Sequence, residues 1–139
     1  MTHRTTLVPT ESAEQQALFQ WARLSEGRYP ELRLLHHIPN GGLRNKPVAV
    51  RLTAEGVRRG IPDICLPVAR GGFHGLYIEL KRTYGGVLSE DQRAWLDALR
   101  AGGYCAMRCD GADQARDAIV AYLSEVFHIE RKEDVHKDA

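Results

Sequence analysis

The stretch "GIPDICLPVARGGFHGLYIELK", from Gly60 to Lys81, limits the possible folds more than any other part of the chain. It contains two short apolar runs, Asp63 to Val68 and Leu76 to Lys81, separated by a glycine-rich segment. Runs of this length around such a turn predict a β-hairpin. Three charged residues stand within these runs, where a purely structural hairpin would place core side chains: Asp63, Glu79 and Lys81.

Helical and extended patterns alternate along the rest of the chain. Helices are expected from Thr10–Ser12 to about Leu24, from Pro47 to the glycines at 56–60, from Ser89 to Leu99 and from Ala112 to about Leu123. Further strands are expected at Arg33–Ile38 and Tyr104–Cys109. The order α, β, α, β, β, α, β, α predicts an α/β fold with a mixed sheet flanked by helices.

Capping residues support the starts of three of these helices. Ser12 with Gln15 fits a capping box for the first helix, although Thr10 is an alternative cap. Ser89 with Gln92 fits the same pattern in the third helix, and Asp110 is expected to cap the fourth.

The length of 139 residues fits a single domain, expected over residues 1–127 and followed by a charged tail at 128–139. The apolar runs are too short to cross a bilayer, and the first residues lack the apolar core of a signal peptide. Three cysteines and no secretion signal argue against a disulfide framework. We therefore expect a soluble, cytoplasmic protein that does not bind membranes.

Basic charge gathers around the charged hairpin. Residues 41–82 contain eight Lys or Arg and three acidic residues, a net charge of +5, whereas the remaining chain has 11 basic and 15 acidic residues, a net charge of −4. Such asymmetry favours a polyanionic partner, and a solvated basic face is the alternative.

The hairpin can bring its two acids together. Strand side chains alternate between faces, so Glu79 and Lys81 share one face while Leu76, Ile78 and Leu80 share the other. The partner strand lies about 5 Å away, which lets Asp63 and Glu79 converge. Two carboxylates in contact repel each other, and a divalent cation relieves that repulsion. Oxygen ligands favour Mg²⁺ or Mn²⁺, while cross-strand salt bridges to Lys81 or Arg82 are the structural alternative.

The start of the first helix, "TESAEQQ", adds acids that could supply a third oxygen to the same cation. Glu11 and Glu14 are the two choices. Acids at a helix N-terminus are also stabilised by the helix dipole, so this pattern alone does not indicate a metal ligand.

Several motifs together resemble one nuclease family. "PD", a gap and "ELK" look like the PD-(D/E)XK nuclease signature, which is short and degenerate. The segments "HIPNGGLRN", "RLTAEGVRRGIPDICLP", "GLYIELK" and "GGVLSEDQRAWLDALRAGGY" are similar to those of the VRR-NUC, or virus-type replication-repair, nucleases of that superfamily, in particular stand-alone phage or prophage members. The resemblance spans about residues 11–121.

This resemblance implies a restriction-endonuclease-like core and metal-dependent cleavage of DNA phosphodiester bonds. It assigns metal binding to Glu11, Asp63, Glu79 and the backbone carbonyl of Leu80. It assigns catalytic roles to Asp63, Glu79, Lys81 and Gln92. It places DNA contacts at Asn40, Gly41, Gly42, Arg44, Arg58 and Arg59, although each of these also fits an ordinary turn or a solvated surface charge.

The resemblance further implies a homodimer that acts on branched DNA such as four-way junctions, because a two-fold symmetric pair of sites suits such a substrate. A catalytically silent DNA-binding module with the same basic surface is the competing interpretation. Activation by Mg²⁺ or Mn²⁺ separates the two, since only the nuclease requires the cation.

Overall fold

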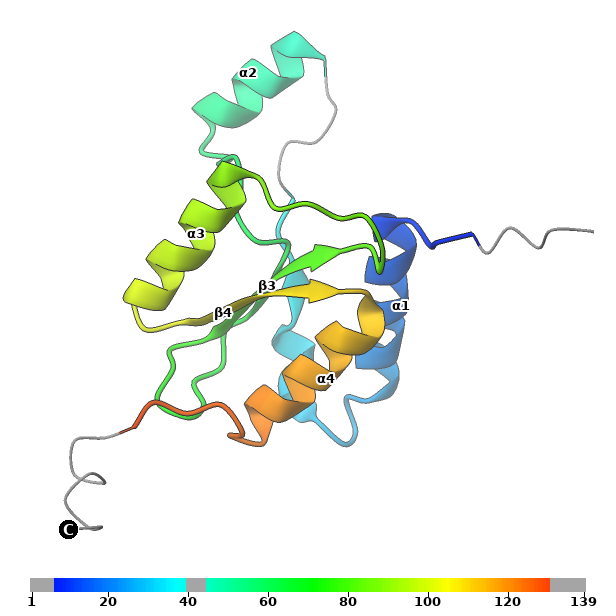
Figure 1. The fold of residues 1–139 in the computed structure, drawn as a ribbon, viewed down its shortest axis with the longest axis vertical. Coiled ribbons are helices and arrows are strands. Elements are labelled where there is room, and N and C mark those ends of the chain that lie inside the picture. The colour runs from blue at the N-terminus through cyan, green and yellow to red at the C-terminus, as the bar shows by residue number, and fades with distance from the viewer. Residues whose placement is uncertain (1–6, 40–44, 131–139) are drawn as a thin grey trace, which may run out of the picture.

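The computed structural model describes residues 7–39 and 45–130, and its elements follow the predicted order (Figure 1). The elements are α1 (Glu11–Leu24), a short 3-10 helix η1 (Pro30–Leu34), β1 (His36–His37), α2 (Lys46–Ala54), β2 (Ile64–Leu66), β3 (Leu76–Lys81), α3 (Glu90–Ala101), β4 (Cys105–Asp110) and α4 (Ala112–Leu123). The α/β fold with a mixed sheet flanked by helices is confirmed.

The four strands form one sheet in the order β1-β2-β3-β4. The predicted hairpin is present: β2 and β3 are antiparallel, with Ile64 opposite Ile78 and Leu66 opposite Leu76. β4 runs parallel to β3, and α3 makes the connection between them, as a parallel pair requires. This arrangement leads the end of β3 and the start of α3 toward the same part of the molecule (Figure 1).

The hydrophobic core lies on the face of β3 that the alternation predicted. Leu76, Ile78 and Leu80 are fully buried, and they belong to one cluster with Leu18 of α1 and Ile119 of α4. Glu79 and Lys81 are buried as well, on the opposite face of the strand and toward α3. Because both faces of β3 are buried, most of its side chains are apolar. Its two charged side chains are tolerated because they have polar partners.

The strand expected at Arg33–Ile38 is mostly wrong. The chain forms η1 at Pro30–Leu34, and only His36 and His37 pair with β2. A 3-10 helix repeats every three residues, so Leu32 and Leu35 bury the same side while Leu34 stays exposed. Pro30 suits the first turn because its missing N–H has no partner there.

Two predicted caps are also wrong. Thr10, the alternative, caps α1 by accepting from the Ala13 N–H at 3.0 Å, so the Ser12 capping box does not form. At α4, Gly111 is the N-cap, because the Asp110 carboxylate instead accepts from Arg108 Nε at 2.8 Å. The predicted Ser89–Gln92 capping box of α3 is confirmed.

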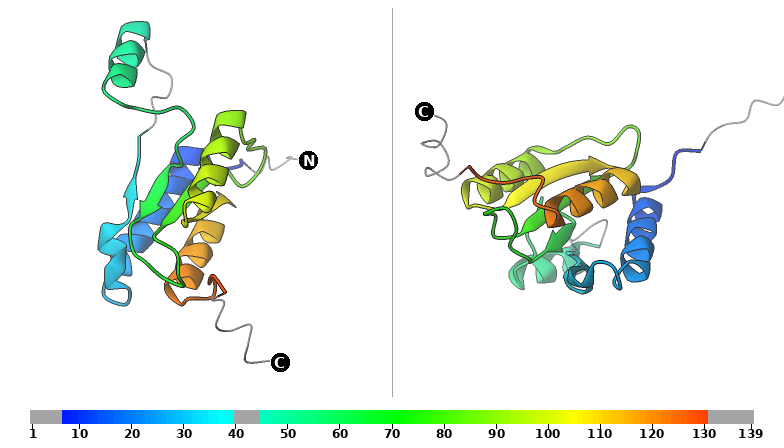
Figure 2. Two further views of the ribbon diagram at one scale, coloured as in Figure 1. Left: turned by 90° about the vertical axis from the view of Figure 1, so that its left-hand side faces the viewer. Right: turned by 90° about the horizontal axis from the view of Figure 1, so that it is seen from below.

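Helix α2 and the chain after α4 lie at opposite ends of the molecule (Figure 1). α2 begins at Lys46, one residue before the predicted start, and projects from one end of the molecule away from the sheet (Figures 1 and 2). At the other end, the Ile129 N–H donates to the Gly71 carbonyl at 2.8 Å, so the chain after α4 contacts the turn between β2 and β3. Within the described residues, no helix combines the length and apolar character needed to span a membrane.

Candidate active site

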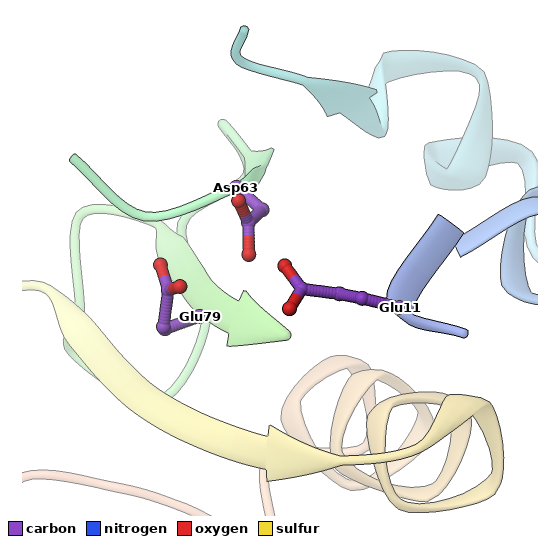
Figure 3. A group of neighbouring side chains, drawn as sticks. All are labelled: Glu11, Asp63 and Glu79. Carbon is purple, nitrogen blue, oxygen red and sulfur yellow. The ribbon is translucent and has the colours of Figure 1, made fainter. Parts of the chain in front are cut away.

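Three carboxylates from distant parts of the chain converge beside the hairpin. Glu11 comes from the first residue of α1, Asp63 directly precedes β2, and Glu79 lies within β3 (Figure 3). One oxygen of each lies within 4.8 Å of the others. Asp63 and Glu79 are buried, whereas Glu11 is exposed and closes the group on the solvent side.

Backbone contacts hold Asp63 in place. Ile64 pairs with Ile78, so Asp63 lies one position further along, beside Glu79. Its Oδ2 accepts from the Leu80 N–H at 2.9 Å, and its carbonyl accepts from the Ile38 N–H at 2.6 Å. Both neighbouring strands therefore fix this residue, and its second carboxylate oxygen stays available to the acid cluster.

A polar network joins Glu79 and Lys81 to the first turn of α3. Lys81 Nζ lies 3.4 Å from Glu79 Oε1 and donates to Gln92 Oε1 at 3.0 Å. Gln92 Nε2 donates to Glu79 Oε1 at 2.9 Å, while its Oε1 also accepts from the Ser89 N–H at 2.9 Å. Because Ser89 and Lys81 both donate to Oε1, the amide nitrogen of Gln92 must face Glu79.

Ionising the three neighbouring carboxylates is unfavourable when no cation lies between them. Burial, followed by the charge of Asp63, raises the pKa of Glu79 to about 8. Burial also raises the pKa of Asp63, although the hydrogen bond from Leu80 opposes the shift. The pKa of Glu11 is raised by partial burial and then by Asp63. All three shifts have the sign expected when carboxylates are brought together in a poorly solvated place.

The donor set fits a hard divalent cation. Glu79 Oε2 is buried and has no hydrogen-bond partner among the described residues, which is costly for a carboxylate oxygen. Oxygen ligands from three carboxylates are the type that Mg²⁺ and Mn²⁺ prefer. A cation between them would satisfy this oxygen and offset the repulsion that raises the three pKa values.

Comparisons with known proteins identify the family of this chain. The family model described as "VRR-NUC domain" matches residues 4–113. The chain belongs to the VRR-NUC family, which is a family of nucleases.

A solved structure described as a VRR_NUC domain protein is 29% identical to this chain, with a TM-score of 0.74. The similarity covers 86% of this chain and 92% of the other. No curated protein matches the chain.

Within this VRR-NUC domain, the structure distinguishes the two acids of α1. Glu11 faces Asp63 and Glu79. Glu14 turns to the start of α4, where its Oε2 accepts from the Ala112 N–H, and its Oε1 accepts from Thr83 Oγ1, in the segment after β3, at 3.2 Å. Glu14 therefore attaches α1 to the start of α4 and has a structural partner of its own. Glu11 alone supplies α1's carboxylate to the cluster.

The residues expected to contact DNA divide into two groups. Asn40, Gly41, Gly42 and Arg44 lie outside the described residues. Arg58 and Arg59 are exposed, and Trp95 Nε1 of α3 donates to the Arg59 carbonyl at 3.0 Å. This bond fixes the segment before Gly60 against α3, the helix that carries Gln92.

Sequence reasoning missed two contacts near the acids. His37 Nδ1 lies 2.8 Å from the Asp63 carbonyl, which holds the imidazole beside the site. Gly86 packs on the stem of Lys81, since a Cβ at this glycine would lie only 2.7 Å from Lys81 Cβ. Neither contact has a local signal, because each joins a residue to a side chain or backbone group from another element.

Proposed function

We propose that this VRR-NUC protein is an endonuclease that hydrolyses DNA phosphodiester bonds with Mg²⁺ or Mn²⁺. The observation that carries the proposal is the convergence of Glu11, Asp63 and Glu79, with Lys81 Nζ 3.4 Å from Glu79. Glu11, Asp63 and Glu79 would hold the cation, with the Leu80 carbonyl as a further predicted ligand. When bound, the cation supplies positive charge that stabilises the phosphoryl transition state and acidifies water.

The protein groups contribute charge and orientation. Lys81 places an ammonium beside the acid cluster, where it can neutralise charge that develops on a phosphate oxygen. Gln92 contacts both Lys81 and Glu79, so it keeps the ammonium and the carboxylate at a constant separation. Asp63 and Glu79 are buried, which strengthens their attraction for a cation relative to carboxylates in water.

Cleavage assays with added cation test the proposal. Supercoiled plasmid and labelled duplexes are incubated with the purified protein in EDTA, Mg²⁺ or Mn²⁺. We expect cleavage only with the cation, and we expect Asp63→Asn and Glu79→Gln each to reduce the rate by about a thousandfold or more.

A matched control is Asp97→Asn. It removes a carboxylate of α3 that is exposed and does not belong to the acid cluster. It should cleave like the wild type. Full activity of Asp63→Asn or Glu79→Gln would refute the assignment. Cation-independent DNA binding without cleavage would instead support the silent binding module.

We further propose that the preferred substrate is branched DNA, such as a four-way junction, and that the active form is a homodimer. The VRR-NUC membership and the concentration of basic residues at 41–82 support this preference. A panel of junctions, flaps, nicked duplexes and intact duplexes of equal length measures it, and light scattering measures the mass in solution. Equal rates on all substrates, or a monomer with full activity, would contradict this part.

A further inference from the structure

The segment between β3 and α3 exposes two large apolar side chains beside the candidate active site. Tyr84 and Val87 are each 77% exposed, and exposed Arg82 directly follows Lys81. Figures 1 and 2 show this segment standing out from the body of the molecule next to the start of α1, the helix that carries Glu11. Single exposed apolar side chains are common on protein surfaces, so the case for a binding role depends on how this segment is held and what it lies beside.

The chain on both sides of Tyr84 is attached to the domain. Before it, Thr83 Oγ1 donates to Glu14 Oε1 at 3.2 Å. After it, the Gly86 carbonyl accepts from Arg108 Nη2 at 2.7 Å, and Gly86 packs closely on the stem of Lys81. The chain is thus held at residues 83 and 86 while the ring between them faces solvent, so core packing does not explain the tyrosine.

The contacts at residues 83 and 86 also connect the segment around Tyr84 to residues of the candidate site or next to it. Glu14 lies one helical turn after Glu11, and Gly86 contacts Lys81 directly. Glu14, which accepts from Thr83, is therefore a neighbour of Glu11, and Gly86 is a neighbour of Lys81. Tyr84 therefore lies on a segment that contacts Lys81 directly and contacts α1 one turn from Glu11.

We propose that residues 82–87 form a docking surface for an unstacked DNA base, with the Tyr84 ring as the stacking platform. This inference rests on the proposed DNA cleavage and names the feature of the substrate that the site selects. A nucleobase has a flat apolar face that stacks on aromatic rings, and the adjoining phosphate suits the exposed guanidinium of Arg82. The net charge of +5 at residues 41–82 complements the polyanion.

This surface would discriminate between DNA structures. In an intact duplex the base faces are covered by stacking, whereas branch points and gaps leave bases free to be displaced. Stacking on Tyr84 would therefore favour gapped and branched DNA over continuous duplex without any reading of sequence.

Binding measured without cleavage tests the proposal. All variants carry Asp63→Ala to prevent hydrolysis, and the probe is a duplex with a short gap that contains one unpaired 2-aminopurine. Tyr84→Ala should weaken binding to the gapped probe by about tenfold and abolish the quenching of 2-aminopurine fluorescence. Affinity for the intact duplex of the same length should not change. Tyr84→Phe should retain the quenching, because the ring remains.

Leu24→Ala is the matched control, since Leu24 is 81% exposed at the opposite end of α1 from Glu11. It should bind both probes like the Asp63→Ala parent. Equal loss of affinity for both probes in Tyr84→Ala, or unchanged quenching, would overturn the proposal. A change in molecular mass from dimer to monomer in Tyr84→Ala would also overturn it, because the surface would then contact a second copy.

The two proposals fail in different ways. Absence of cleavage by the wild type with Mn²⁺ would refute the nuclease function. If the wild type cleaves with the cation but Tyr84→Ala binds and quenches the gapped probe like its parent, only the docking surface is refuted.

Discussion

Gln92 Nε2 donates a 2.9 Å hydrogen bond to Glu79 Oε1, and this contact joins the first turn of α3 to the most buried carboxylate of the acid cluster. The same glutamine completes the capping box with Ser89 and accepts from Lys81. One side chain thus stabilises a helix start and orients two groups of the candidate site. These two effects can be separated by mutation.

Gln92→Ala should reduce cleavage by about 10- to 100-fold, because Glu79 and Lys81 lose the group that orients them. Ser89→Ala removes the cap hydroxyl and leaves the contacts of Gln92 to Glu79 and Lys81 available, so it should cost about 1 kcal/mol of stability with little change in rate. Rates and urea unfolding of both variants are compared. Equal rate losses in the two variants would indicate that capping alone matters.

The apoprotein should become less stable as the pH rises from about 5 to 8. The pKa of Glu79 is raised from 4.5 to about 8, so the folded protein keeps a proton that the unfolded chain has released. Folding then takes up a proton, and the free energy of unfolding falls with pH across this window. The raised pKa values of Asp63 and Glu11 act in the same direction. Urea unfolding in EDTA at several pH values measures the slope.

Glu79→Gln should reduce this slope, since the neutral amide has no proton to retain. Added Mn²⁺ should restore stability of the wild type at pH 8, because a cation favours the ionised carboxylates. A wild-type slope of opposite sign in EDTA would contradict the raised pKa of Glu79.

Lys81→Met should separate catalysis from cation binding. The methionine keeps much of the buried stem but removes the ammonium that lies 3.4 Å from Glu79. Cleavage should fall by about 100-fold or more, since a preorganised charge at a developing oxyanion has an effect of this size. Calorimetric titration with Mn²⁺ should still show binding, because the three carboxylates remain. Loss of Mn²⁺ binding would instead indicate that Lys81 organises the acids.

Glu11 and Glu14 should respond differently to substitution, although they are one turn apart. Glu14→Ala should lower the free energy of unfolding by about 1–2 kcal/mol, because the Ala112 N–H and Thr83 lose their acceptor. Glu11→Gln should leave stability unchanged or slightly higher, since it removes a carboxylate repelled by Asp63, and should weaken Mn²⁺ binding. The reverse pattern would exchange the two roles.

Local patterns in the sequence were sufficient for most of the fold. The hairpin follows from alternation in "LYIELK" and the glycine-rich turn, and the start of α3 follows from Ser89 and Gln92. Such signals act between residues at most four apart, or through a repeat along one strand, and so they can be read without knowledge of the rest of the chain. The convergence of Asp63 with Glu79 could also be expected, because the alternation in both strands and the turn between them limit which residues face each other.

Tertiary packing decided what the local patterns left open or indicated wrongly. Thr10 and Ser12 both suit a helix start, and Glu11 and Glu14 both suit its first turn. Which of the two glutamates joins the acid cluster depends on α4, because Glu14 accepts from the N–H of Ala112, which lies 98 residues away in the sequence. The apolar residues of Arg33–Ile38 suit a strand locally, but Leu32 and Leu35 are buried together because the chain before His36 turns as a 3-10 helix.

The amino-acid sequence by itself therefore determined the order of the elements, the hairpin and the pair of acids at its end, because these depend on neighbouring residues. The family resemblance named Glu11 and Gln92 as site residues, but only the tertiary structure shows their contacts. Glu11 lies with Asp63 and Glu79, Glu14 contacts α4, and Gln92 contacts both Lys81 and Glu79. The physical reason is that these contacts form between separate elements, so they exist only after the core has packed the elements against one another.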